Sequence, residues 1–522
     1  MKKFLLTAAL CVLTLGLNAQ TWTAPAVPGA DLASVGSETL GYFYNVEANA
    51  FLSYGMDWNT NACATRLTNG ETAVSNPQRC YALVDGTKVS LRMADKADKY
   101  VYCPSANAND IWVDGDANRE FTYTETASGS HVYTLTNVTY AQALDLSWDR
   151  GGHLTLAGGK GHTRWAFIPE TSITDGTFAT YRARVQLYNV YQAIVAAGKT
   201  STYASQISTA RTTYVNTSAT AAQLRSAAAT LFRAAAAGLS SSSVDVSFLF
   251  DNADMAATAS CSGWGASNAI AWGQFEQYHA ALTLTQTKSV PQGIYDVSFR
   301  SLYRQDGTDA APIFTAAGQN TVTVTVPDLT AIDFNVGNDN DNGYKVGPLY
   351  VQPNDRKSAS EALLHEQSEA LAHNVIVGSA GQLALTVSMT SGSQWLNWQN
   401  MDVVFLGTST ATMRTELKAL IDEADGIYNA SYNGAAALKQ KLDAARTVYN
   451  NTSASAIAIY DAQQNLTEAI ATYRYAAASV DFPYDCNDLL QNPSFEKGFD
   501  HWTNNGMQTQ DNTAFAGKDG NL

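Results

Sequence analysis

Apolar residues recur every three or four positions in two stretches of the chain, and this spacing predicts helices that each bury one face. In the first stretch the apolar stripes are Leu187, Val190, Tyr191 and Ile194, then Tyr203, Ile207, Ala210 and Tyr214, then Leu224, Ala228 and Leu231. In the second stretch they are Leu417, Leu420, Ile421 and Ala424, then Leu438, Leu442 and Ala445, then Leu466 and Ile470. Each stretch therefore predicts three short antiparallel helices.

The two helical stretches are copies of one module. The run ARTTYVNTSAT from Ala210 matches ARTVYNNTSAS from Ala445. We expect Thr217–Ser218 and Thr452–Ser453 to end one helix and to offer an N-cap hydroxyl to the next, and Gly238 to form a C-terminal cap. The module resembles the FIVAR-like three-helix bundles that separate domains in large bacterial surface proteins, and this resemblance implies a spacer.

Between the two copies, apolar and polar residues alternate with a period of two. The runs GIYDVSFRSLYR from Gly293, LALTVSM from Leu383 and MDVVFLG from Met401 predict half-buried antiparallel strands, and hence a β-sandwich. With its opening LFDNADM and its closing WLNWQNMDVVFLG, the segment from Val244 to Gly407 resembles galactose-binding-like jelly-roll modules. Such modules are common in secreted polysaccharide-binding proteins of gut-dwelling Gram-negative bacteria.

The end of the chain repeats the opening of the sandwich. The motif is degenerate at Asn252–Met255, but it stands intact as NPSFE from Asn492, with Trp502 following. A strand or two without a partner sheet cannot bury an apolar face. We therefore expect residues 478–522 to be the truncated start of a second β-sandwich, and the chain to be a fragment of a longer protein.

The region before the first helices contains many short strand-like runs at regular spacing, which predicts a barrel or a trefoil. The runs YFYNVEANAFLSYGMDWNTNA from Tyr42 and RWAFIP from Arg164 resemble a divergent ricin-type β-trefoil lectin domain. The expected fold class is therefore multidomain and mainly β, with α spacers. The expected segments are a signal peptide at 1–19, a β-trefoil-like domain at 20–172, a three-helix bundle at 176–240, a galactose-binding-like jelly-roll β-sandwich at 244–407, a second three-helix bundle at 409–477 and the truncated sandwich at 478–522.

The N-terminus predicts export. Two lysines precede an apolar run from Phe4 to Leu17, which is the layout of a cleaved signal peptide and is too short to span a bilayer. We expect a mature chain that begins at Gln20 and is secreted or held at the outer cell surface. A net charge of −15 with only 15% charged residues argues against nucleic acid and anionic lipid as partners.

Five cysteines remain in the expected mature chain, in a compartment that permits disulfides. They are Cys63, Cys80, Cys103, Cys261 and Cys486. Their odd number leaves at least one thiol outside an intramolecular bridge, and we favour a bridge between Cys63 and Cys80 because the two are close in sequence. The alternative is that all five are small buried hydrophobic residues.

No catalytic template fits the sequence, which has no Gly-x-Ser-x-Gly elbow and no phosphate-binding loop. Glu361, His365, Glu369 and His373 recur every four residues, so a helix would align two imidazoles and two carboxylates for a metal ion. We favour a solvated helix face instead. The run NDNDNG from Asn338 resembles a calcium loop, but its neutral alternate positions favour a turn. No cofactor is therefore expected, and Ca²⁺ in the sandwich remains an alternative.

Aromatic rings beside Asp, Asn or Arg side chains are sufficient to bind a sugar, because a pyranose offers C–H groups on one face and hydroxyls at its rim. In the trefoil-like domain such sets are Asp57, Trp58 and Asn59, then Trp112 with Asp114 and Asp116, then Trp148 with Asp149. In the sandwich the candidates are Trp264, Trp272, Tyr278, Trp395, Asn397 and Trp398. The alternative for each tryptophan is core packing. On an extended strand Trp395 and Asn397 share a face opposite Trp398, so at most one of these two tryptophans faces solvent.

The preferred hypothesis is a non-catalytic, secreted or surface-exposed modular protein that binds extracellular glycans through its trefoil and its sandwich. The second hypothesis is that these are accessory modules of a larger polysaccharide-degrading enzyme, a glycoside hydrolase whose catalytic domain follows Leu522. The third is an adhesive or structural surface protein without sugar binding. No transmembrane segment is expected under any of the three.

Overall fold

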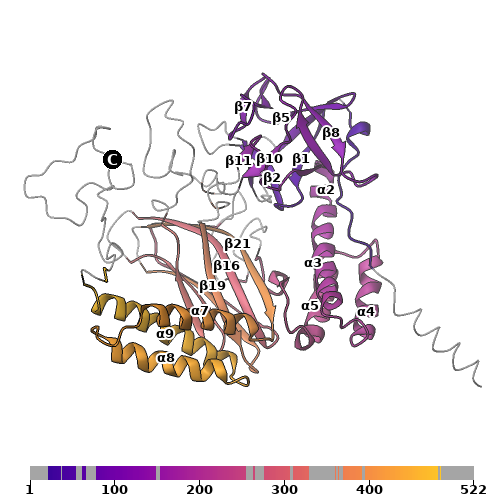
Figure 1. Cartoon of the computed structure of the whole chain (residues 1–522). Coiled ribbons are helices and arrows are strands. Elements are labelled where there is room, and N and C mark those ends of the chain that lie inside the picture. The colour runs from indigo at the N-terminus through magenta and orange to yellow at the C-terminus, as the bar shows by residue number, and fades with distance from the viewer. Residues whose placement is uncertain are drawn as a thin grey trace, which may run out of the picture. The chain divides into compact units, whose positions relative to one another are not determined.

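A computed structural model represents the protein. It describes residues 22–36, 38–54, 62–65, 78–147, 153–253, 263–264, 275–305, 310–328, 359, 363, 368–390, 394–479 and 482–483. The chain divides into two compact units, Met1–Ser409 and Thr410–Leu522. Figure 1 shows that strands dominate the first unit and helices the second, so the protein is mainly β with several helices, as the sequence predicts. The expected boundaries of the individual segments stay predictions.

Twelve strands in the first unit form a trefoil-like β domain. They are β1 (Thr39–Asn45), β2 (Ala50–Tyr54), β3 (Ala62–Thr65), β4 (Cys80–Asp85), β5 (Lys88–Met93), β6 (Tyr100–Tyr102), β7 (Trp112–Gly115), β8 (Phe121–Glu125), β9 (Tyr133–Asn137), β10 (Asp145–Ser147), β11 (His153–Thr155) and β12 (Arg164–Pro169). Six of them close a barrel-like ring in the order β1, β12, β9, β8, β5, β4 and back to β1. Each consecutive group of four strands repeats one plan, in which the outer two strands enter the ring and the inner two form a hairpin.

The core of this domain follows from alternation along the strands. On β5, Val89, Leu91 and Met93 are buried, and the residues between them are only partly so. Where ring strands end, buried asparagines satisfy backbone groups. The Asn45 amide donates to the His162 carbonyl at 2.7 Å, so the chain can turn without leaving a buried carbonyl unpaired.

Three helices form the first bundle: α3 (Thr177–Ala196), α4 (Ala204–Val215) and α5 (Ala221–Ala235), preceded by the short α2 (Glu170–Thr174). The stripe residues predicted on α3 and α5 are all buried. The N-cap of α5 is Thr220, which forms a reciprocal capping box with Gln223. The predicted cap at Thr217–Ser218 is wrong, because the Asn216 side chain accepts from the Ser218 amide and turns the chain before the helix begins.

Gly238 does not cap α5 as predicted. The helix ends at Ala235, and Gly238 ends the short 3-10 turn Ala236–Gly238 that follows. A Cβ at Gly238 would lie 2.3 Å from the Tyr203 hydroxyl oxygen. Glycine here leaves room for the end of the Tyr203 side chain and does not serve a left-handed backbone.

Two antiparallel sheets form the sandwich. One contains β13 (Val244–Asp245), β14 (Phe275–Tyr278), β16 (Gly293–Gln305), β19 (Glu369–Val377) and β21 (Gln394–Gly407), and the other contains β15 (Leu282–Ser289), β17 (Ile313–Ala317), β18 (Thr321–Thr325) and β20 (Gln382–Met389). The predicted alternation is confirmed by the buried residues of β16 and β20, which include Tyr295, Val297, Phe299, Ser301, Tyr303, Leu383, Leu385, Val387 and Met389. This core continues onto α5, where Phe232 contacts Phe405 with 5.1 Å between ring centroids.

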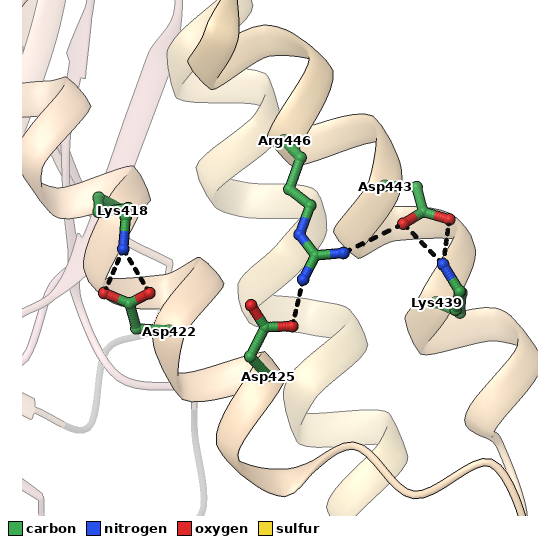
Figure 2. A network of polar contacts seen from close by, with 6 residues as sticks. All are labelled: Lys418, Asp422, Asp425, Lys439, Asp443 and Arg446. Carbon is green, nitrogen blue, oxygen red and sulfur yellow. Dashed lines mark hydrogen bonds and ion pairs between the residues drawn. The ribbon is translucent and has the colours of Figure 1, made fainter.

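The second unit contains a second three-helix bundle: α7 (Ala411–Ile427), α8 (Ala435–Asn450) and α9 (Ala456–Ala476). Its predicted stripes are buried except for Leu420, which is half-buried. Ser455 caps α9 in place of the predicted Thr452–Ser453, because an asparagine turns the chain first, as in the first bundle. Its surface carries ion pairs, and Figure 2 shows Arg446 between Asp425 and Asp443.

Cys63 and Cys80 are not bridged, so the favoured pairing is wrong. Cys63 lies on β3 of a hairpin, whereas Cys80 lies on β4 of the closed ring. Both side chains and that of Cys103 are buried, and burial raises the pKa of Cys80 and of Cys103 to about 12. These three cysteines are small buried hydrophobic residues, and Cys261 and Cys486 lie outside the described residues.

Glu369 and His373 lie on β19, so the helical face expected to carry them does not exist. Ala370 and Ala372 alternate with exposed residues and enter the sandwich core, which is why the segment is a strand. The other two members of that set, Glu361 and His365, and the loop from Asn338 lie outside the described residues.

Two further features concern metals and membranes. Within the described ranges, no group of three or more His, Cys, Asp and Glu side chains could hold a metal ion. No helix in the same ranges combines the length and the hydropathy needed to cross a bilayer.

Candidate functional site

The β6–β7 hairpin presents a separate face of the trefoil-like domain. In the described structure β6 and β7 pair only with each other, whereas β3 of the first hairpin pairs with β11 of the third. The inward residues of β6 and β7, Val101 and Val113, are fully buried. The alternate residues of both strands therefore project from the domain surface.

The outward residues of this hairpin, together with Arg119, are called the hairpin site. They are Tyr100, Tyr102, Trp112, Asp114 and Arg119. Tyr102 lies opposite Trp112 across the two strands. Both rings are half-buried, and Asp114 is exposed, as is Asp116 just beyond β7. One predicted set, Trp112 with Asp114 and Asp116, thus lies on an accessible surface.

Glycine fixes the position of Tyr102. A Cβ at Gly115 would lie 2.7 Å from the Tyr102 ring, so the ring lies directly over the backbone of β7. Burial raises the pKa of Tyr102, and the Asp114 carboxylate, which hydrogen-bonds the phenol, raises it further. The phenol therefore stays neutral and donates, which leaves acceptor positions on the Asp114 carboxylate for a ligand.

Arg119 supplies the donors of the hairpin site. Its guanidinium carbon lies 3.9 Å from the centroid of the Tyr100 ring. Stacking of this kind holds the guanidinium plane while its N–H groups remain at the ring edge. The site thus combines aromatic faces with a charged acceptor and a charged donor, the groups that a pyranose ring with its hydroxyls would contact.

In the sandwich, the structure brings three predicted residues to one sheet face. Tyr278 on β14 lies opposite Trp395 on β21, and Asn397 follows on the same face. Tyr278 is 56% exposed, but Trp395 is 3% exposed and donates from its indole to Glu276 at 2.9 Å. Arg304 lies over the Trp395 ring at 5.0 Å. This burial does not fit an exposed stacking ring at Trp395.

Asn397 is fully buried, and neither its amide nitrogen nor its amide oxygen has a hydrogen-bond partner among the described residues. Such a group costs free energy unless water or a ligand satisfies it. Among the described sandwich candidates, Asn397 and Trp398 have buried polar atoms without hydrogen-bond partners, and only in Asn397 are both a donor and an acceptor affected.

Trp264 and Trp398 are core residues. Trp264 is 1% exposed, and its indole donates to the Asp251 carbonyl at 3.1 Å. Trp398 is fully buried and stacks on Phe275 at 4.1 Å. The expectation of a sugar platform at Trp264 is corrected by this burial, because a ring enclosed by other side chains offers no face to a ligand.

The remaining predicted residues lie outside the described residues. They are Asp57, Trp58 and Asn59, in the connection between β2 and β3, Trp148 and Asp149, in the connection between β10 and β11, and Trp272. Their roles stay predictions. In sequence order, each of the three trefoil sets lies on, between or next to the inner two strands of one four-strand group.

Sequence reasoning missed Tyr100, Tyr102 and Arg119. The signal for the two tyrosines was present, because KYVYCP alternates tyrosine with a buried valine. Nothing in the sequence pointed to Arg119, since its contact with Tyr100 depends on the folded hairpin.

Comparison with known proteins gives no family assignment. No family model matches the chain, and no curated protein matches it. Among solved structures, the chain is similar to SeviL bound to asialo-GM1 saccharide at 14% identity, with a TM-score of 0.20, over 26% of this chain and 98% of that one. It is also similar to a Macrolepiota procera ricin B-like lectin in complex with lactose, at 15% identity and a TM-score of 0.21, over 26% of this chain and 97% of that one.

A third similar structure is ThreeFoil, a designed three-fold symmetric protein, at 15% identity and a TM-score of 0.20, over 24% of this chain and 96% of that one. The assignment of a trefoil-like domain rests on the closed ring and the three hairpins.

Proposed function

We propose that this protein binds extracellular glycans, and that the hairpin site is a principal contact. The observation that carries the proposal is the cluster of Trp112, Tyr102 and Asp114 on a hairpin that pairs with no other strand in the described structure. Aromatic faces cover the C–H groups of a sugar, and the carboxylate accepts from its hydroxyls. The exposed carboxylates of Asp114 and Asp116 would repel acidic sugars, so the preferred ligands are neutral.

The wider architecture is part of the same proposal. The protein would be exported by its N-terminal signal and would act as a non-catalytic modular binder, with the helical bundles as spacers. The main alternative makes the same modules the accessory part of a larger polysaccharide-degrading enzyme. An adhesive role without sugar binding is the third reading, and it would be favoured by binding to cells or matrix protein without binding to glycans.

A glycan array of the wild-type protein, followed by calorimetric titration with the best ligand, tests the proposal. Trp112→Ala removes the largest ring of the site and is expected to weaken binding at least about tenfold. Asp114→Asn keeps the shape and removes the charge, and we expect a loss of about three- to tenfold. Tyr475→Ala is the matched control, because Tyr475 is an aromatic residue that is 64% exposed on α9.

Equal affinity of the wild-type protein and of both hairpin variants would reject the hairpin site. A wild-type protein that binds no glycan on the array would reject the function itself. Circular dichroism of each variant separates loss of the site from loss of the fold.

A further inference from the structure

We propose that β18 is the contact by which two copies of this protein pair into a dimer. β18 ends its sheet in the described structure, whose strand order is β15, β20, β17, β18. An edge strand of this kind presents unpaired backbone N–H and C=O groups, which another strand can pair with.

The outward backbone groups of β18 belong to its threonines. Backbone bonds join Gly318 to Asn320 and Val326 to Pro312 at the two ends of the β17–β18 hairpin. Because inward and outward groups alternate along an antiparallel pair, Val322 and Val324 bond to β17, and Thr321, Thr323 and Thr325 direct their N–H and C=O groups outward. No hydrogen bond to these outward groups occurs among the described residues.

The other described edges of the sandwich are protected. At β15, Lys288 forms an ion pair with Asp251 at 2.7 Å, and the Gln286 side chain hydrogen-bonds the Asp251 backbone. The chain at Asp251 is therefore held against β15. At β19, Glu369 and His373 place charged or titratable groups on exposed positions. At the remaining edge, β13 and β14 are short, with two and four residues. Charges, covering segments and short strands are the known devices against edge pairing.

Among the described residues, β18 carries no charge and no bulge, and β19 contacts it at the Asn320 end, where the Asn320 side chain donates to the Asn374 carbonyl at 3.0 Å and accepts from the Ile376 amide at 2.7 Å. Its sequence is Thr-Val-Thr-Val-Thr, with no charge, no proline and no register shift against β17. The valines pack against the sandwich core, and the threonines are exposed. β-branched residues of this kind favour an extended, pairing-competent strand.

The same sequence fits a second copy of itself. It reads identically in both directions, so antiparallel pairing about Thr323 places threonine opposite threonine and valine opposite valine. Thr323 would exchange both backbone bonds with Thr323 of the second copy, and Thr321 would do so with Thr325. An interface that repeats itself about a two-fold axis closes as a dimer and does not propagate. Such a dimer would carry two hairpin sites and would bind multivalent glycans more tightly.

Sedimentation velocity of the full chain over a range of concentrations tests this inference. The wild-type protein is expected to shift from monomer to dimer as its concentration rises. Thr323→Pro removes an outward N–H that β17 does not use, and we expect the dimer dissociation constant to rise about tenfold or more. Thr287→Lys, at an exposed threonine of β15, is the matched control and should dimerise like the wild type.

A charge pair makes the test independent of proline effects. Thr323→Lys and Thr323→Glu each place like charges opposite each other, so each should dimerise more weakly than the wild type. Mixing the two variants should restore pairing as a heterodimer. A wild-type chain that stays monomeric at every concentration, or a dimer that Thr323→Pro and Thr323→Lys leave unchanged, would overturn the inference. Glycan binding by the monomer would be unaffected, so the two proposals fail separately.

Discussion

The two helical bundles share one sequence plan but differ in what covers them. In the first bundle, Trp22 stacks between Tyr191 and Tyr214, at 4.5 Å from each ring centroid. The Tyr214 hydroxyl also donates to the Thr23 carbonyl. In the second bundle the matching tyrosine is Tyr449, which lines an open groove of about 470 Å³. Among the described residues, an extra segment therefore covers this tyrosine in the first bundle and not in the second.

The two bundles also differ in their content of acidic residues. Residues 177–235 of the first bundle contain no Asp or Glu, whereas residues 411–476 of the second contain seven. These acids form the pairs of the second bundle, including Lys418 with Asp422 and Arg446 with Asp425 (Figure 2). A helix face that joins a larger apolar core needs no such pairs, and a bundle that stands as its own unit remains soluble through them.

Both bundles contain the same hydrogen bonds at the turn between their second and third helices, which is called the joint. Arg184 donates to the carbonyls of Tyr214 and Asn216, and Arg414 donates in the same way to those of Tyr449 and Asn451. A guanidinium fork suits two carbonyls at a helix end, where backbone acceptors lack partners. The duplicated run beginning at Ala210 and Ala445 therefore contains the same pair of carbonyl acceptors in both bundles.

The largest effect should come from removing the cover of the first bundle. Trp22→Ala deletes a ring that is 5% exposed, and we expect it to destabilise the first unit by about 3–5 kcal/mol. Tyr449→Ala, on the open groove, should cost the second unit less than half as much. Hydrogen exchange of α4 and α8 in the intact chain measures both. Equal losses of stability in the two bundles would contradict a stabilising role for Trp22.

The next effect concerns a position where the two cores differ. Ala228 is fully buried on α5, and its counterpart on α9 is Gln463, which donates to the Met413 carbonyl at 2.8 Å. Ala228→Gln would force a polar group into a filled core, so we expect a loss of about 1–3 kcal/mol in urea unfolding. Gln463→Ala removes this bond, but the Met413 carbonyl keeps its intrahelical partner in α7, so we expect a smaller loss of about 0.5–1.5 kcal/mol. Unchanged stability of Ala228→Gln would contradict the described packing.

A smaller and equal effect is expected at the shared joint. Arg184→Ala and Arg414→Ala each remove charge-assisted bonds to two carbonyls, and we expect each to cost about 1–2 kcal/mol. The measurement is the unfolding free energy of each unit, followed by hydrogen exchange at the helix ends. A loss of unfolding free energy in only one bundle would contradict an equal role for the two arginines.

The smallest effect should be the pH dependence of the second bundle. The Lys439 side chain, hydrogen-bonded to Asp443, lowers the pKa of that carboxyl below 3.8. A carboxyl with a lowered folded-state pKa stabilises the fold above the unfolded pKa and loses this contribution as pH falls through the folded pKa. The α8 region should therefore weaken below about pH 4, while α3–α5, without carboxyl groups, should not weaken by this route. A thermal melt of Asp443→Asn that retains the wild-type acid dependence would contradict this assignment.

Local sequence patterns were sufficient to predict the helices and strands but not which strands pair with one another. The stripes on α3 and the alternation on β16 predicted which residues are buried, because both depend on a period within one element. The missing bridge between Cys63 and Cys80 could not be foreseen, since hairpin and ring strands separate only when the six-strand ring closes. Closure of a sheet is set by long-range pairing.

The candidate site shows the same limit. Trp112 and Asp114 could be selected from sequence because both stand on one short strand with a buried valine between them. Trp395 also alternates correctly, yet it is buried, because β14 pairs beside it and Arg304 lies over its ring. Alternation predicts that two faces differ and does not say whether the outer face is open.

The most direct test of glycan binding at the hairpin site is to follow the tryptophan indole N–H resonances by NMR during titration with the best array ligand. Substitution Trp112→Phe assigns the Trp112 signal by its disappearance. We predict that the Trp112 signal shifts on saturation while those of the buried Trp264, Trp395 and Trp398 stay in place. Binding that leaves the Trp112 signal unchanged and moves another tryptophan would contradict the account.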